Sequence, residues 1–119
     1  MNADDMKKRT RAFALRIIRL AESLPKTPTA IAIRNQMLRC GPSVGANCRA
    51  ACRAKSPRDF IAKMGIVEEE ADESSYWIEL LIDADLIKRE KSFRLAERSR
   101  RDLIDRSFIN QDYEKWRSR

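Results

Sequence analysis

The chain has 119 residues, of which 43% are hydrophobic and 36% are charged, with 25 basic and 18 acidic side chains. This length fits one domain over residues 1–119, and the hydrophobic content is not typical of a disordered protein. No apolar run approaches the roughly 18 residues that cross a membrane, and with only three glycines and four prolines we expect few, long elements.

The N-terminal residues do not have the pattern of a signal peptide, because acids precede the bases and no small-residue cleavage site follows the apolar part. The three cysteines are an odd number, which without a secretory signal indicates free thiols in a reducing compartment. We therefore expect a cytoplasmic protein with no membrane partner.

The net charge of +7 is distributed unevenly along the chain. Residues 25–55 hold six bases and no acid, whereas residues 56–87 hold nine acids and two bases. The segments before and after these two are also net basic. Because a basic surface attracts polyanions, the charge favours nucleic acid as the class of partner.

The first element is a helix predicted over residues 4–24. Asp4 and Asp5 suit its first turn, where carboxylates meet free amides and the positive end of the helix dipole. An apolar stripe recurs at helical steps of four, three and four: Phe13, Ile17, Leu20 and Leu24. Pro25 ends this helix.

The second helix is predicted over residues 29–54. Thr27 or Thr29 caps it, with Pro28 in a first-turn position. Pro42 is the difficult residue, because proline inside a helix removes a hydrogen bond and clashes one turn back, at a cost of about 3 kcal/mol. The segment is therefore either one kinked helix or two helices. Apolar spacing resumes without a polar loop, which favours the kink.

The third helix, predicted over residues 57–85, has the clearest pattern. Ser56 caps it, Pro57 lies in its first turn and Asp59 completes a box-like start. Alternating steps of four and three then connect Phe60, Met64, Val67, Ala71, Ser74, Ile78, Leu81 and Asp85. We expect Ile61, Trp77 and Ile82 to widen this buried face. The spacing matches left-handed bundle packing.

A fourth helix is predicted over residues 92–110, with Leu95, Leu103, Ile104 and Phe108 as its apolar contacts. No run alternates as a strand does. The fold class is therefore all-α, an antiparallel up-down-up-down four-helix bundle.

Three clusters of bases are candidate nucleic-acid contacts, because clustered cations release the counterions condensed on phosphates. The acid-free segment supplies Arg34, Arg39, Arg49, Arg53 and Lys55, and the fourth helix supplies Arg94, Arg98 and Arg101 on one face. The third cluster is Lys7, Lys8, Arg9 and Arg11. Each cluster also has an interpretation without nucleic acid. The bases of the acid-free segment pair with acids of the third helix, those of the fourth helix form a solvated face, and those near the N-terminus serve solubility.

A polar core is expected from Ser43, Asn47 and Glu73. We hypothesise that Asn47 hydrogen-bonds Glu73 across the second and third helices, because a buried polar pair can fix the register of packed helices. A catalytic role for these residues would need a partner base, and the chain has no histidine. We expect no enzymatic activity.

Metal and cofactor sites are not expected. The acidic run from Glu68 to Glu73 lacks the histidines of di-metal carboxylate bundles. Cys40, Cys48 and Cys52 lack the paired spacing of zinc ligands, so we interpret them as small core or interface residues. No nucleotide-binding fingerprint is present.

Taken together, residues 13–87 resemble the four-helix-bundle family linked to intervening sequences in 23S ribosomal RNA genes. The resemblance rests on Arg39, Ser43, Asn47, Phe60 and Glu73 at their spacings, and on these segments: LPKTPTA, IRNQMLRCGPSVGANCRAACRAKSP and DFIAKMGIVEEEADESSYWIELL. The wider family includes accessory proteins of diversity-generating retroelements. The resemblance implies a bundle that assembles into a ring-like homopentamer and associates with nucleic acid without known enzymatic activity.

Two functions follow as expectations. The first is a non-enzymatic homo-oligomer that associates with RNA or DNA through backbone contacts. The second is a protein-interaction scaffold, in which the basic and acidic helices mediate subunit assembly and the docking of a partner protein. Salt-sensitive binding of nucleic acid separates the two.

Overall fold

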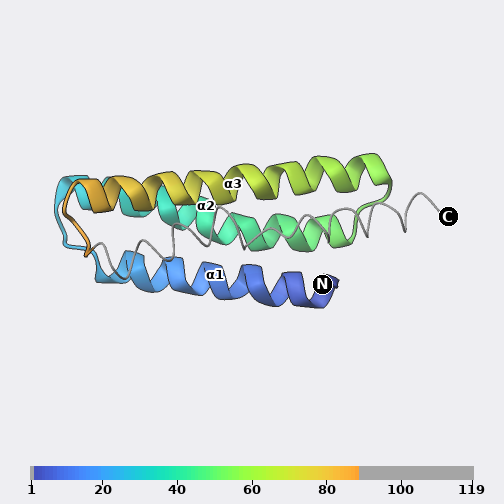
Figure 1. Cartoon of the computed structure of the whole chain (residues 1–119), viewed down its shortest axis with the longest axis horizontal. Coiled ribbons are helices and arrows are strands. Elements are labelled where there is room, and N and C mark those ends of the chain that lie inside the picture. The colour runs from blue at the N-terminus through green and yellow to red at the C-terminus, as the bar shows by residue number, and fades with distance from the viewer. Residues whose placement is uncertain (1, 89–119) are drawn as a thin grey trace.

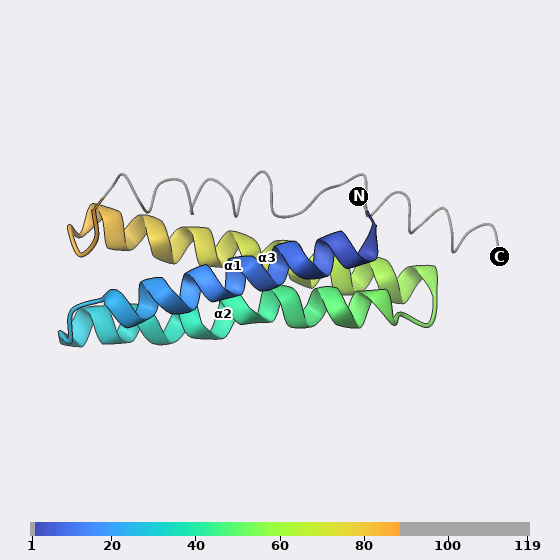
Figure 2. The ribbon, with the colours of Figure 1, turned by 90° about the horizontal axis from the view of Figure 1, so that it is seen from below.

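Three long helices joined by short connections make up the described part of the chain. The computed structural model of the protein describes residues 2–88. Helix α1 is Ala3–Ser23, α2 is Pro28–Cys52 and α3 is Pro57–Asp83. The helices run antiparallel to one another in chain order (Figure 1), and α2 packs against both α1 and α3 (Figure 2). The all-α class is confirmed. The predicted fourth helix over residues 92–110 lies outside the described residues.

Each helix begins at a side-chain cap. Asn2 Oδ1 accepts a hydrogen bond from the Asp5 amide at 2.9 Å, and Asp5 accepts one from the Asn2 amide in return, which forms a capping box. Thr27 caps α2, with Pro28 at its start. Ser56 caps α3 by accepting from the Asp59 amide at 3.1 Å. The caps at Thr27 and Ser56 agree with the sequence analysis, whereas the cap at Asn2 was missed.

Helix α2 continues through Pro42 as a single helix, so the alternative of two helices is wrong. Its buried face spans the proline without a break, from Met37 and Cys40 on one side to Val44 and Cys48 on the other. We attribute the tolerance of Pro42 to this packing, because burial on both sides of the proline offsets the lost hydrogen bond.

The core lies along the α1–α2 and α2–α3 seams and contains residues from all three helices. Every position of the four-and-three repeat of α3 from Phe60 to Leu81 is buried, as is Ile82, and Trp77 is partly buried. Two predictions for α3 are wrong. Ile61 is 44% exposed, and Asp85 lies beyond the end of the helix, exposed and with a positive φ of 56°. Among residues 2–88, no helix has both the length and the hydropathy that a membrane crossing requires.

Candidate nucleic-acid interface

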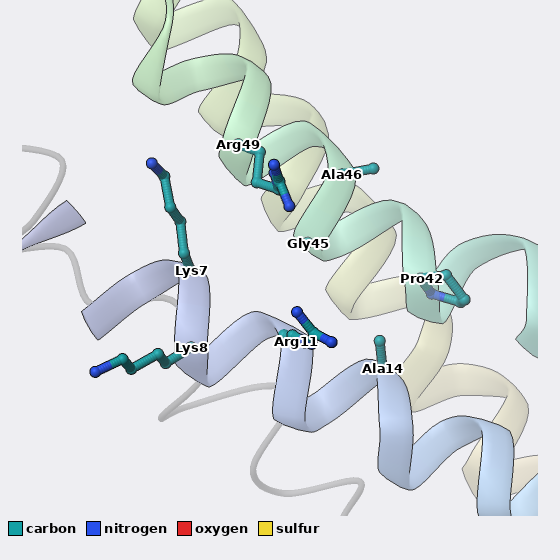
Figure 3. Close-up of a pocket in the computed structure, with 8 residues that line it drawn as sticks. All are labelled: Lys7, Lys8, Arg11, Ala14, Pro42, Gly45, Ala46 and Arg49. Carbon is teal, nitrogen blue, oxygen red and sulfur yellow. The ribbon is translucent and has the colours of Figure 1, made fainter. Parts of the chain in front are cut away.

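A groove between α1 and α2 gathers four basic side chains (Figure 3). Its volume is about 360 Å³. We name it the α1–α2 groove, and the described residues that line it are Lys7, Lys8, Arg11, Ala14, Pro42, Gly45, Ala46 and Arg49. No acid is among them. The groove therefore brings Arg49 of the first cluster together with Lys7, Lys8 and Arg11 of the third.

The helical repeat explains why these residues meet. In α1, Met6, Thr10 and Phe13 face the core, which places Lys7, Arg11 and Ala14, each one residue further along, at the rim of the same seam. In α2, Val44 and Cys48 are buried. The residues that directly follow these two buried positions therefore lie beside the α1 side of the groove. They are Gly45 and Ala46 after Val44, and Arg49 after Cys48.

Gly41 of α2 allows α1 to approach closely, whereas Gly45 leaves more room. A Cβ atom on Gly41 would lie 2.7 Å from Cγ2 of Ile17, closer than packed carbon atoms allow. A Cβ on Gly45 would lie 3.5 Å from Oγ1 of Thr10, an ordinary contact. Gly45, Ala46 and Ala14 have no polar side chains, so this part of the groove lining carries none.

The four bases of the groove have no acidic partner among residues 2–88. The ion pairs in that range join Arg39 to Glu70 and Glu73, and Lys63 to Asp59. Arg11 and Arg49 point toward one another from α1 and α2, whereas Lys8 points away from α2 (Figure 3). Like charges that converge without a counter-charge repel one another, so a bound anion would be favoured there.

The other predicted contacts are not brought into this groove. Arg53 follows the last residue of α2 and is exposed, as is Lys55 in the connection to α3. The Lys55 amide donates to Oδ2 of Asp59 at 3.2 Å, so this residue helps to hold the start of α3. Arg94, Arg98 and Arg101 lie outside the described residues.

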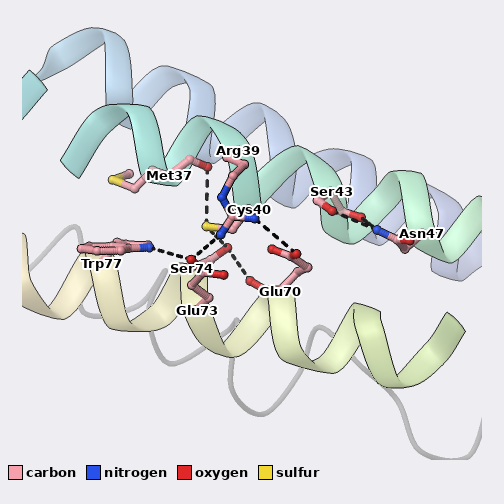
Figure 4. Close-up of polar contacts among 9 residues, drawn as sticks. All are labelled: Met37, Arg39, Cys40, Ser43, Asn47, Glu70, Glu73, Ser74 and Trp77. Carbon is pink, nitrogen blue, oxygen red and sulfur yellow. Dashed lines mark hydrogen bonds and ion pairs between the residues drawn. The ribbon is translucent and has the colours of Figure 1, made fainter. Parts of the chain in front are cut away.

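The expected hydrogen bond between Asn47 and Glu73 is not formed (Figure 4). Asn47 Nδ2 donates instead to the backbone oxygen and to the hydroxyl of Ser43, both at 2.9 Å, within α2. Glu73 accepts from the Arg39 guanidinium and from Nε1 of Trp77, the latter at 3.3 Å. Asn47 lies eight residues beyond Arg39 along α2, about 12 Å at 1.5 Å per residue, so it is level with an earlier turn of α3, whereas Arg39 is level with Glu73 and reaches it.

Arg39 therefore forms a charged link between α2 and α3. Its guanidinium binds Glu73 and lies 3.5 Å from Oε1 of Glu70. The hydrogen bond between Arg39 and Glu73 lowers the pKa of the Glu73 carboxyl and raises the pKa of Arg39. Oε2 of Glu70 is buried and accepts no hydrogen bond from a described residue.

The cysteines lie in the packing of α2. Ser74 Oγ lies 3.2 Å from Sγ of Cys40, and burial raises the pKa of that thiol. A hydrogen bond with Cys52, together with burial, raises the pKa of Cys48. A raised pKa keeps a thiol protonated and poorly nucleophilic. Within residues 2–88, no group of three or more potential metal ligands comes together.

Comparison with known proteins identifies relatives of the chain. The model of the family described as 23S rRNA-intervening sequence protein matches residues 4–101. A crystal structure of a protein of unknown function from the S23 ribosomal protein family of Bacteroides thetaiotaomicron is 32% identical, with a TM-score of 0.80. That match covers 96% of this chain and 99% of the other. Among curated proteins, no match was found.

Proposed function

We propose that this chain, which belongs to the 23S rRNA-intervening sequence protein family, is a non-enzymatic cytoplasmic protein that associates with RNA or DNA through backbone contacts. The observation that carries the proposal is the α1–α2 groove, where four bases meet without an acid in the described lining. Phosphates supply the missing negative charge, and the counterions released from the nucleic acid favour binding.

Further bases extend the proposed contact surface beyond the groove. Arg53 and Lys55 continue the basic end of α2, and Arg94, Arg98 and Arg101 belong to the helix predicted over residues 92–110, which would complete the four-helix bundle. These contacts are to the phosphate backbone, which positions a nucleic acid without reading its sequence. We therefore expect little sequence specificity.

The proposal includes assembly into a homo-oligomer, a pentamer by the family resemblance. The outer face of α3 is the surface that suits a subunit contact. It exposes Ile61 at 44% and Tyr76 at 52%, with Gly65 between them. No described atom lies within 4 Å of the position of a Cβ on Gly65. A helix-interior glycine with free space around it weakens its own helix by about 0.5–1 kcal/mol, so close approach of a second chain would explain its presence.

The test is binding of purified, nuclease-treated protein to a structured RNA and a duplex DNA across a salt series. The logarithm of affinity should fall linearly with the logarithm of salt concentration, with a slope near −0.9 per phosphate contacted on duplex DNA. The double variant Arg11→Ala, Arg49→Ala should weaken binding and reduce that slope by about two.

The matched control removes two charges from α1 outside the groove. Arg16 and Arg19 are exposed and do not line it, so Arg16→Ala, Arg19→Ala changes the net charge equally. This variant should keep most of the affinity. Absence of binding at low salt would overturn the proposed function, and equal losses in the two double variants would remove the groove from it.

A protein-interaction scaffold is the second candidate. The acidic residues Glu68, Glu69 and Asp72 are exposed on α3 beside Ile61 and Tyr76, a mixture of charge and apolar surface that also suits a protein partner. If the salt series shows no binding of nucleic acid, the charged helices would serve assembly and docking, and this candidate would replace the first.

A further inference from the structure

The α1–α2 groove is a hollow, which distinguishes it from a flat basic face. Its volume of about 360 Å³ lies at the lower end of the roughly 300–1,000 Å³ that is typical of small-ligand sites. A hollow of this size holds a group as large as one nucleotide. In a nucleic-acid duplex the nucleobases are stacked inside the double helix, so only phosphate oxygens would touch the rim of the groove.

The lining has two chemically different parts. The basic side chains lie at the rim, where Arg11 of α1 and Arg49 of α2 point toward one another across the groove (Figure 3). The rest of its lining is Ala14, Pro42, Gly45 and Ala46, none of which has a polar side chain. A ligand that matches both parts has an anionic group joined to a less polar body, which describes a phosphate joined to its sugar and base.

We propose that the α1–α2 groove accepts one nucleotide unit of a single-stranded segment. Its phosphate lies between Arg11 and Arg49, and its sugar or base covers Ala46 and Pro42. This inference rests on the proposed function and adds a preference to it. An unpaired nucleotide enters the hollow, whereas a duplex contacts only the basic side chains at the rim. The uncharged part of the lining has no side chain that could hydrogen-bond one nucleobase in preference to another. The groove therefore accepts any of the four nucleobases.

The test narrows the groove without removing a charge. Ala46 is exposed and lines the groove, so Ala46→Leu adds bulk to the lining on the α2 side and leaves Lys7, Arg11 and Arg49 in place. Ala32 is exposed on the same helix and does not line the groove, so Ala32→Leu is the matched control. Thermal unfolding followed by circular dichroism checks that both variants fold as the parent does.

Binding is measured with a short single-stranded RNA, with a duplex DNA, and with adenosine monophosphate as a mononucleotide probe. Ala46→Leu should weaken binding of the single strand about tenfold, or 1.4 kcal/mol, while duplex affinity stays near that of the parent. Ala32→Leu should change neither. Adenosine monophosphate should shift the amide resonances of Gly45 and Ala46 in the parent and leave them unshifted in Ala46→Leu.

The outcomes separate this inference from the proposed function. If the parent binds RNA with the expected salt dependence but Ala46→Leu binds the single strand equally well, the nucleotide site is wrong and the backbone contact stands. Equal weakening of single strand and duplex, with no amide shifts from adenosine monophosphate, would also overturn the nucleotide site. If no nucleic acid binds at low salt, the proposed function itself fails.

Discussion

At Gly41, one absent methyl group determines how closely α1 packs on α2. The nearest atoms to a Cβ at this position all belong to Ile17, at 2.7 to 3.0 Å. Ile17 is fully buried, so its side chain has little freedom to move aside. Gly41 is thus required by packing, although its backbone has ordinary helical geometry.

We expect Gly41→Ala to lower the free energy of unfolding by about 1–3 kcal/mol, the usual cost of overpacking a core. Gly45→Ala is the control on the same helix. Its Cβ would make an ordinary contact with Thr10 at 3.5 Å, and the gain in helix propensity is about 0.5–1 kcal/mol. Urea unfolding measures both. Equal stability of the two variants would mean that α1 can shift away from α2 at little cost.

Single residues also show which contacts can be predicted from the sequence and which cannot. The sequence correctly predicted the caps at Thr27 and Ser56, because cap signals are local. It could not predict that Arg39, rather than Asn47, would bind Glu73. Both lie on α2, eight residues apart, and the choice depends on the register of α2 along α3, which the apolar spacing within each helix does not fix.

Between elements, the Arg39–Glu73 ion pair is a pH-dependent link from α2 to α3. The hydrogen bond from Arg39 lowers the pKa of Glu73 below its ordinary value of 4.5. A carboxyl group whose pKa is lowered by folding contributes stability above its unfolded pKa, and this contribution is lost as the pH falls through the folded pKa. The link therefore stabilises the fold at neutral pH and weakens in acid.

We expect Glu73→Gln to lower the free energy of unfolding at neutral pH, and the difference from the parent to shrink as the pH falls below about 4.5. The effect should be smaller than that of Gly41→Ala, because the Arg39 side chain is half exposed and the pair is screened by solvent. Glu69→Gln on the exposed face of α3 is the control. Denaturant unfolding across the acid range would contradict the link if the difference were constant with pH.

At this scale the sequence predicted α3 best and α2 less completely. The steps of four and three in α3 place its core positions from Phe60 to Leu81 correctly, because a strict repeat leaves one possible buried face. The repeat failed at Asp85, where the helix had already ended. In α2, small residues such as Ala30 and Gly41 are buried, and small residues give no strong apolar signal from which to predict a face.

For the whole molecule, the uneven charge of the sequence becomes a difference between surfaces. The acid-free segment contains all of α2, and the acidic segment contains all of α3. The sequence left open whether the bases of α2 pair with the acids of α3. In the described residues Arg39 does so, whereas Arg49 lies in the α1–α2 groove. Lys7 and Arg11 join Arg49 only through the packing of α1 on α2, which a linear sequence does not display.

The outer face of α3 gives the prediction that concerns the assembled protein. Within one chain, Gly65→Gln should be harmless, because the space around this position is open and glutamine favours a helix more than glycine does. At a subunit contact, the same side chain would hold two helices apart. We therefore expect Gly65→Gln to lower the mass measured by sedimentation velocity while it maintains or raises helicity. Ala12→Gln, at an exposed position of α1, should leave the mass unchanged.

Each outcome of that measurement changes a different part of the proposal. A parent chain that sediments as a monomer at every concentration would overturn the homo-oligomer. An oligomer whose mass is the same in Gly65→Gln would move the subunit contact away from this part of α3. If the mass falls and the affinity per chain for nucleic acid is retained, the acidic helix serves assembly and the α1–α2 groove serves binding. The opposite charges of the two segments would then have separate physical roles, because a polyanion is repelled by the surface that joins subunits and attracted to the one that remains free.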